Sequence, residues 1–272
     1  MFITRVCSSI VLVIVTATCL VCGGPLLAGV LLAISLVAFY ELSKAVGIHE
    51  EKKKANGLEL VATLGIIAYY VVMYFANRYV FLCFALVMTF LAIMFVYVFS
   101  FPKFHANQVM STFYSVIYAP VLLSFLYLTR ELEQGVYIVW MIFISSWGCD
   151  TFAYLTGMQL GKHKLAPALS PKKSIEGAVG GVIGASAVGG LFGYIMVHLA
   201  AATPDVIPVF AVIGAIGAVI SQVGDLAASA IKRNHDIKDY GKLIPGHGGI
   251  MDRFDSVIFA APMIYFLAVF LL

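Results

Sequence analysis

Residues 79–100 read YVFLCFALVMTFLAIMFVYVFS, a run without a single charged side chain. A helix needs about 20 apolar residues to cross the hydrocarbon core of a bilayer, and this run is long enough. Comparable apolar runs fall at about 4–22, 25–43, 58–76, 108–128, 136–157, 176–200, 206–231 and 254–272. The sequence therefore predicts an all-α fold, a polytopic membrane helix bundle of about nine transmembrane helices.

The composition of the whole chain agrees with this fold class. Of the 272 residues, 62% are hydrophobic and 11% are charged, and the mean hydropathy is +1.00. Soluble domains average about 45–50% apolar and about 25% charged residues. The net charge of only +3 gives no basic surface for a nucleic acid, so we expect no nucleic-acid partner. All five cysteines lie in apolar segments, which favours packing over redox chemistry.

Basic residues are distributed unevenly between the two ends of the predicted helices. Fifteen of the seventeen Lys and Arg residues fall at the N-terminus or in the loops after even-numbered spans. Only Arg78 and Arg130 fall in the opposite loops. Because cytoplasmic loops of membrane proteins are enriched in Lys and Arg, we expect a cytoplasmic N-terminus in the cell membrane. Loops 158–175 and 232–253 would then face the cytoplasm.

Asp150 lies inside the sixth apolar run, although an Asp at the centre of a transmembrane helix costs about 2.5–3.5 kcal/mol on insertion scales. Ser146, Asp150 and Tyr154 are four residues apart, so on an α-helix they would stack on one face. Such a stripe can supply hydrogen bonds between helices or line a polar cavity.

Asp225 lies inside the eighth run, with Ser221 and Ser229 four residues before and after it. Lys232 and Arg233 follow on the same helical face, one turn nearer the cytoplasm. Acidic and basic groups together on one face favour a polar cavity over packing alone.

The loop after the sixth span reads GKHKLAPALSPKKSIEG over residues 161–177. Ser170 and Pro171 have the pattern of a helix N-cap followed by proline at the first helical position. We expect a helix start beside Lys172 and Lys173 that could hold a phosphate, although a solvated basic loop is the alternative. The glycines that follow are expected to permit close helix packing; they are Gly177, Gly180, Gly181, Gly184, Gly189 and Gly193.

Residues 244–255 read IPGHGGIMDRFD. Gly248 and Gly249 allow a positive φ or a close approach of the backbone to a ligand. Asp252 and Asp255 are three apart and share a helical face; with Asp225 they offer the hard oxygen ligands that Mg²⁺ prefers. The Cys and His residues have no zinc spacing. The pattern predicts a cytoplasmic site for phosphate and metal at the mouth of a helix bundle.

These residues resemble the signature of the phosphatidate cytidylyltransferases, also called CDP-diacylglycerol synthases. The resemblance matches every fixed position of the signature over residues 229–255, SAIKRNHDIKDYGKLIPGHGGIMDRFD. Residues 150–154 (DTFAY) and 170–177 (SPKKSIEG) look like two earlier blocks of the family, with Ser174 where Thr is common. The resemblance covers roughly residues 145–256; the first half of the chain shares only its apolar spans.

The resemblance implies a reaction in phospholipid biosynthesis, in which CTP and phosphatidic acid give CDP-diacylglycerol and pyrophosphate. CTP would arrive from the cytoplasm and the lipid from the bilayer, with Mg²⁺ as the cofactor. A second, monovalent cation and a homodimer stay open. Two alternatives also stay open: a related CTP-dependent polyprenol or lipid kinase, and an ion-coupled transporter.

From the residue patterns and the resemblance together we assign the candidate site. The catalytic residues are Asp225, Lys232, Arg233, Lys238, Asp239, His247, Asp252, Arg253 and Asp255, of which Asp225, Asp252 and Asp255 bind the metal. The substrate-binding residues are Asp150, Tyr154, Ser170, Lys172, Lys173, Ser221, Ser229, Gly248 and Gly249. His247 has three open roles: phosphate donor, proton carrier or structural loop residue. We expect residues 1–135 to form N-terminal transmembrane helices and residues 136–272 to form the catalytic region.

Overall fold

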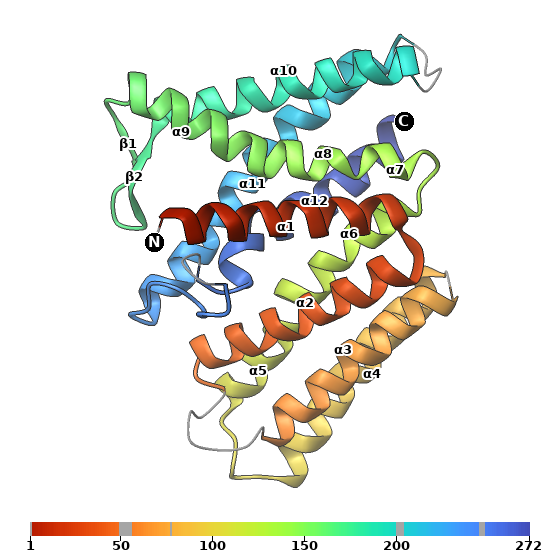
Figure 1. The fold of residues 1–272 in the computed structure, drawn as a ribbon. Helices are drawn as coiled ribbons and strands as arrows, with labels where there is room; N and C mark the ends of the chain where they lie inside the picture. The colour runs from red at the N-terminus through yellow and green to blue at the C-terminus, as the bar shows by residue number, and fades with distance from the viewer. Residues whose placement is uncertain (1, 49–55, 77, 200–203, 245–247) are drawn as a thin grey trace. The chain divides into compact units, whose positions relative to one another are not determined.

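A computed structural model describes the chain except for residues 1, 49–55, 77, 200–203 and 245–247. Each of the nine predicted spans is helical (Figure 1). The long helices are α1 (Phe2–Cys22), α2 (Gly24–Ala45), α3 (Gly57–Ala76), α4 (Tyr79–Phe99), α10 (Ile175–Leu199), α11 (Val206–Asn234) and α12 (Met251–Leu271).

The fifth and sixth spans are mainly helical but change their winding, and Val139 of the sixth is a turn residue between two short helices. The fifth consists of α5 (Ala106–Val116), the π-helical segment η1 (Ile117–Val121) and α6 (Leu122–Arg130). The sixth consists of α7 (Gly135–Ile138), α8 (Trp140–Phe143), the π-helical η2 (Ile144–Gly148) and α9 (Cys149–Leu160). Within the described residues, eight helical segments are long and apolar enough to cross a membrane, and the described apolar part of α1, Ile10–Cys22, is shorter. The predicted membrane helix bundle is confirmed.

The chain divides into two compact units. Unit 1 comprises Met1–Tyr127 and His235–Arg253, and unit 2 comprises Leu128–Asn234 and Phe254–Leu272. The candidate site residues therefore belong to two units, each described by itself below. The predicted boundary between N-terminal transmembrane helices (residues 1–135) and a catalytic region (residues 136–272) stays a prediction.

In unit 1, tyrosine hydroxyls join helices across the apolar interior. The Tyr70 hydroxyl lies 2.7 Å from Ser35 Oγ on α2 and donates to the Pro120 carbonyl in η1 at 3.0 Å. The Tyr69 hydroxyl lies 3.1 Å from Ser124 Oγ on α6. Buried hydroxyls need such partners because water is absent from a membrane interior. Here they hold α3 against α2 and against the fifth span.

In unit 2, glycines bring α10 close to its neighbours. A Cβ on Gly181 would lie 2.8 Å from Cys149 Sγ and 2.9 Å from the Cys149 carbonyl oxygen on α9. One on Gly214 of α11 would lie 2.6 Å from the Ala185 carbonyl oxygen. The other glycines that were predicted to pack closely also face near neighbours: Gly177, Gly180, Gly184, Gly189 and Gly193. The packing prediction is confirmed, and α9 and α10 lie side by side (Figure 1).

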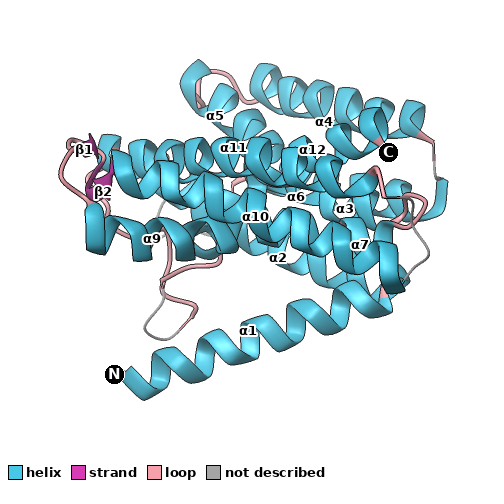
Figure 2. Ribbon diagram, turned by 90° about the horizontal axis from the view of Figure 1, so that it is seen from above, coloured by secondary structure: helices cyan, strands magenta, loops and turns pink. Residues whose placement is uncertain are grey.

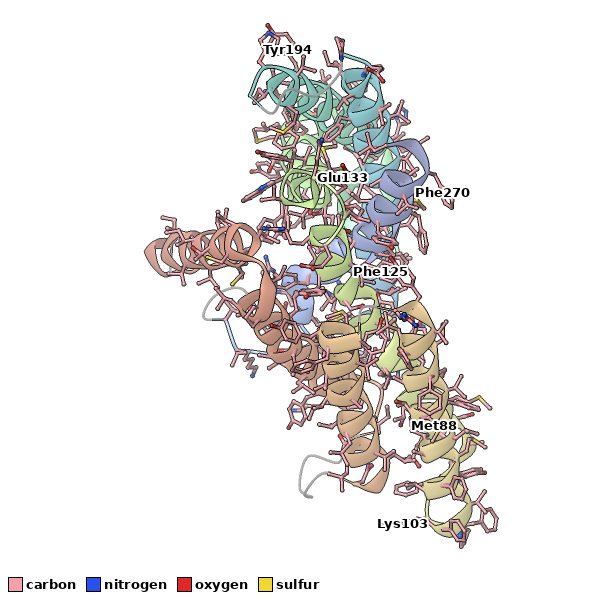
Figure 3. The ribbon with its side chains drawn as sticks, turned by 90° about the vertical axis from the view of Figure 1, so that its right-hand side faces the viewer. Met88, Lys103, Phe125, Glu133, Tyr194 and Phe270 are labelled. Carbon is pink, nitrogen blue, oxygen red and sulfur yellow. The ribbon has the colours of Figure 1, made fainter. Side chains whose placement is uncertain are left out.

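Two strands, β1 (Lys164–Ala166) and β2 (Ser170–Ser174), form an antiparallel hairpin between α9 and α10. They are the only strands among the described residues, which are otherwise mainly helical (Figure 2). The outer helix faces carry large apolar side chains, among them Met88 on α4 and Phe270 on α12, labelled in Figure 3. Exposed apolar faces of this kind suit contact with lipid.

Candidate active site

The hairpin corrects the prediction that a helix starts at Ser170. Ser170 pairs with Ala166 and Ser174 with Lys164, so both lysines of the block lie on β2. The helix starts at Ile175 instead, and Ser174 Oγ accepts a hydrogen bond from the Gly177 N–H at 3.1 Å. A residue before proline prefers the extended conformation, and strand pairing here prevails over the helix-start pattern. Ser174 is therefore the residue that caps the helix.

Glu176 fixes the hairpin to the first turn of α10. Its carboxylate accepts hydrogen bonds from the Lys162 N–H at 3.1 Å and the His163 N–H at 3.2 Å, and it lies 2.6 Å from His163 Nδ1. These contacts hold the base of the hairpin that carries Lys172 and Lys173. Lys172 and Lys173 therefore lie on a strand, β2, whose hairpin is fixed at its base by Glu176.

A cavity of about 450 Å³ lies within unit 2 between α9, the hairpin and α10. Four residues predicted to bind substrate line it, namely Asp150, Tyr154, Lys172 and Lys173. The rest of the lining is mainly small or apolar: Ala153, Gly157, Met158, Leu165, Ser174, Gly177, Ala178 and Gln222. Tyr154 is 69% exposed, so its ring lies at the rim. The structure brings basic, acidic and apolar groups together in one cavity.

Lys173 links this cavity to α11. Its Nζ forms an ion pair with Asp225 Oδ2, and the Ser229 hydroxyl lies 3.5 Å from the other oxygen, Asp225 Oδ1. The predicted Asp225–Ser229 stripe is confirmed because α11 is a regular helix in which residues four apart are neighbours. Ser221, one turn earlier, is fully buried, and its Oγ has no hydrogen-bond partner among the described residues.

Asp255, on α12, completes an acidic cluster in unit 2. Its carboxyl group interacts electrostatically with Asp225, Lys232 and Asp150. Gly224 permits this proximity, because a Cβ there would lie 2.8 Å from Phe259 Cβ and 3.0 Å from the Asp255 carbonyl oxygen. The positive charges of Lys173, which pairs with Asp225, and of Lys232 favour the ionised carboxylates.

The stripe predicted over Ser146, Asp150 and Tyr154 is wrong at Ser146. Ser146 lies in the π-helical η2, is fully buried, and donates its hydroxyl to the Ile142 carbonyl at 2.7 Å. A π turn contains more residues than an α turn, so four-residue spacing no longer keeps side chains on one face. Asp150 and Tyr154 reach the cavity without it.

The metal that the resemblance implies is Mg²⁺. Mg²⁺ typically binds through one or two carboxylates together with substrate phosphates, and Asp225 and Asp255 offer neighbouring carboxylates. In the described part of the chain, no group of three or more His, Cys, Asp or Glu side chains could hold a metal ion. The donor chemistry of unit 2 fits a metal whose remaining ligands come from the substrate.

In unit 1, Asp252 organises the signature loop. It is 7% exposed, and its Oδ2 accepts hydrogen bonds from the Tyr240 N–H at 2.8 Å and the Gly249 N–H at 3.0 Å. Gly248 has the predicted positive φ, of 85°, and a Cβ there would lie 2.9 Å from Asp252 Oδ2. Its carbonyl accepts from the Ile244 N–H at 2.9 Å. Metal binding by Asp252 and substrate binding by Gly248 and Gly249 stay predictions.

The other assigned residues have the following places. Lys232 is half-buried and Arg233 exposed, both in the last turn of α11. Lys238 and Asp239 are exposed in the signature loop, and His247 falls outside the described residues. Arg253 is half-buried, and its Nε has no hydrogen-bond partner within the described chain. Their catalytic roles stay predictions.

Two polar residues near these sites were missed by the sequence analysis. Gln222 lines the cavity and donates to the Ala178 carbonyl at 3.0 Å. Glu41, on α2, accepts hydrogen bonds from the Ile250 and Met251 N–H groups in unit 1. A signal for Glu41 existed, since a carboxylate inside an apolar span is expected to have a specific partner.

Comparison with known proteins bears on both sites. A model of the family described as "Cytidylyltransferase family" matches residues 3–271. The chain belongs to the cytidylyltransferase family. This confirms the family relationship that the signature, the DTFAY block and the SPKKSIEG block indicated, and it extends the match to the N-terminal helices.

Curated relatives agree with this assignment. The chain is 41% identical over 139 residues to the phosphatidate cytidylyltransferase of Bacillus subtilis, covering 51% of this chain and 50% of that protein. It is 35% identical over 151 residues to the phosphatidate cytidylyltransferase of Thermotoga maritima, covering 56% of each. The matches thus span about half the length of these relatives.

Proposed function

We propose that this chain is a phosphatidate cytidylyltransferase that forms CDP-diacylglycerol and pyrophosphate from CTP and phosphatidic acid. The observation that carries the proposal is the cavity of unit 2. It combines Lys172, Lys173 and Asp150 with an apolar lining, inside a group of helices that can cross a membrane. Such a cavity suits a substrate that has phosphate groups and acyl chains.

The chemistry follows from the charges at this cavity. A phosphate oxygen of the lipid attacks the α-phosphorus of CTP; a new P–O bond forms while the bond to the β-phosphate breaks, and pyrophosphate leaves. Phosphoryl-type transfers depend mainly on positioning and charge neutralisation. Lys172 and Lys173 would bind phosphate oxygens, and Lys173 would exchange Asp225 for a substrate phosphate. Neither role requires a covalent intermediate.

We propose that Asp225 and Asp255 hold Mg²⁺ when nucleotide binds. When bound, the metal would neutralise developing negative charge on the phosphates. Asp225 is paired with Lys173 and lies near Asp255, so entry of a cation would relieve the repulsion between the two carboxylates. This supports a dependence of the reaction on divalent metal.

Product identification tests the proposed function. The purified chain in mixed micelles should release pyrophosphate from CTP only when phosphatidic acid is present, and a lipid CDP product should appear in equal amount. ATP in place of CTP is the control and should give little product. Release of CDP with a phosphorylated lipid would instead identify a lipid kinase, and absence of any nucleotide turnover would overturn the enzymatic proposal.

We also propose that the cavity faces the cytoplasm. The excess of Lys and Arg in loops on one side supports this orientation. A cysteine introduced at exposed Lys172 should react with a membrane-impermeant maleimide only from the cytoplasmic side. A cysteine at exposed Glu131 should react only from the other side. Reversal of this labelling would overturn the orientation.

A further inference from the structure

Glu41 is 6% exposed although it is a carboxylate in a helix that can cross a membrane. Its Oε1 accepts a hydrogen bond from the Ile250 N–H at 3.1 Å, and its Oε2 accepts one from the Met251 N–H at 2.8 Å. These N–H groups lie at the start of α12, where a helix has donors without intrahelical partners. A residue of α2 thus caps a helix more than 200 positions later in the chain.

Asp252 is a second acceptor for the same stretch. Its carboxylate accepts hydrogen bonds from the Tyr240 and Gly249 N–H groups. We call Glu41 and Asp252 the carboxylate clamp. Together they accept four backbone hydrogen bonds from the stretch Tyr240–Met251, and the negative charges lie at a helix N-terminus, where they are favourable. A Cβ on Gly241 or on Gly249 would collide with the Glu41 carboxylate, so a larger residue at either position would displace that side chain.

The described part of the signature loop has little regular structure. Between α11 and α12 the described residues form no helix or strand, and their one regular pairing is the isolated bridge of Ile244 with Gly248. Backbone N–H groups that lack secondary structure must find side-chain or water partners. The clamp supplies such partners to four N–H groups of this stretch, those of Tyr240, Gly249, Ile250 and Met251.

We propose that Glu41 is a positioning residue for the reaction. It acts through the signature stretch, holding the backbone from Gly249 to Met251 so that Asp252 and Arg253 keep their working geometry. The proposal rests on the proposed function for its kinetic part and on the hydrogen bonds of unit 1 for its structural part. It assigns a role to the N-terminal half of the chain, which carries no signature motif.

Glu59 provides a matched control. It is also a buried glutamate of unit 1, 4% exposed, and its Oε2 accepts a hydrogen bond from the Asn56 N–H at 2.9 Å at the start of α3. Glu41→Ala and Glu59→Ala therefore remove the same group from similar surroundings, but Glu59 serves a helix that carries none of the assigned site residues.

The test measures steady-state kinetics and hydrogen exchange by mass spectrometry on the full chain in micelles. Residues that orient a functional group typically contribute about 10- to 100-fold, and we expect Glu41→Ala to lower kcat by that factor. We expect kcat to fall by a larger factor than the KM for CTP rises, because Glu41 itself is not assigned to bind substrate and acts by orienting the loop. Exchange should accelerate in peptides that cover residues 249–256. Glu59→Ala should accelerate exchange near Asn56 and leave kcat unchanged.

A third variant keeps the test decisive if Glu41→Ala does not fold. In Glu41→Gln the amide oxygen can accept one of the two N–H groups, so its kcat should lie between those of wild type and Glu41→Ala. Normal kcat with faster exchange at 249–256 would overturn the positioning role, as would an equal loss of kcat in Glu59→Ala. A wild-type chain that never turns over CTP would defeat the proposed function, whereas the exchange data would still decide whether the clamp holds the loop.

Discussion

The carboxylates that the structure places in the two units have different kinds of partner. In unit 1, Glu41 and Asp252 accept hydrogen bonds from backbone N–H groups. In unit 2, Asp225 is paired with the amine of Lys173, and Asp255 lies near Asp225 and Lys232. A backbone donor stays in place unless the chain refolds, whereas a lysine amine on a flexible stem can exchange one partner for another. The carboxylates of unit 1 therefore shape the backbone, and those of unit 2 are suited to handling charged ligands.

The largest effect on kcat is expected at Asp225, whose partner Lys173 can exchange it for another charged group. Asp225→Asn removes the charge that pairs with Lys173 and that would bind Mg²⁺. Removing one preorganised electrostatic contact at a reacting centre typically costs about 10²–10³ in kcat, and we expect a loss of that size. The measurement is pyrophosphate release at saturating CTP, lipid and Mg²⁺.

Asp205→Asn is the matched control for this variant. Asp205 is exposed next to the first turn of α11, the same helix that carries Asp225, and it is absent from the cavity lining. Its substitution should leave kcat near the wild-type value. A near-wild-type rate for Asp225→Asn would show that the carboxylates of unit 2 do not handle the reacting charges.

A smaller loss of kcat is expected from substitution of Asp252, a member of the carboxylate clamp. Asp252→Asn keeps an oxygen that can accept from the Tyr240 or Gly249 N–H group but loses the negative charge. Because Asp252 would then act by orienting the loop, kcat should fall by about 10- to 100-fold. Exchange of the amide hydrogens of Tyr240 and Gly249 should accelerate. A loss as large as that of Asp225→Asn with unchanged exchange would mean that Asp252 acts on ligand directly, and the contrast between the units would fail.

The parts of this fold that follow local rules could be predicted from the sequence. The spans are set by runs of apolar residues, and the contact of Asp225 with Ser229 follows from regular helical spacing. Simple helical rules failed at two positions. Ser170 has the pattern of a helix cap but pairs with Ala166 in a hairpin, and Ser146 lies in a π turn that alters the four-residue spacing.

Glu41 could not be connected to its site from the sequence. Its partners are backbone N–H groups of Ile250 and Met251, and a backbone group leaves no residue-type pattern. The pairing of Lys173 with Asp225 at the cavity could not be predicted from the sequence either. The two residues are 52 positions apart, and their contact depends on how the hairpin and α10 place the lysine. Tertiary contacts of this kind join residues whose local motifs are separate.

A still smaller effect is expected at Lys172, which lies at the exposed side of the cavity. Lys172→Ala should raise the KM for CTP or phosphatidic acid by about fivefold, equivalent to the ~1 kcal/mol upper range of an exposed ion pair, with little change in kcat. Lys164→Ala is the control, because Lys164 is exposed on the other strand of the same hairpin and does not line the cavity. A large fall in kcat for Lys172→Ala would place Lys172 among the groups that act on the reacting phosphates.

The smallest effect is expected at Ser229, whose hydroxyl lies 3.5 Å from Asp225 Oδ1. That distance is at the upper limit for a hydrogen bond, so the contact contributes little to the orientation of the carboxylate. Ser229→Ala should therefore lower kcat by about twofold, corresponding to the ~0.5 kcal/mol lower range for a single hydrogen bond. Steady-state assays of Ser229→Ala, Asp225→Asn and the double variant would measure the coupling between the two side chains. If Ser229 acts only through Asp225, then its removal should have no further effect once Asp225 is replaced. Equal losses from Ser229→Ala in both backgrounds would show that the hydroxyl contacts a substrate independently of Asp225.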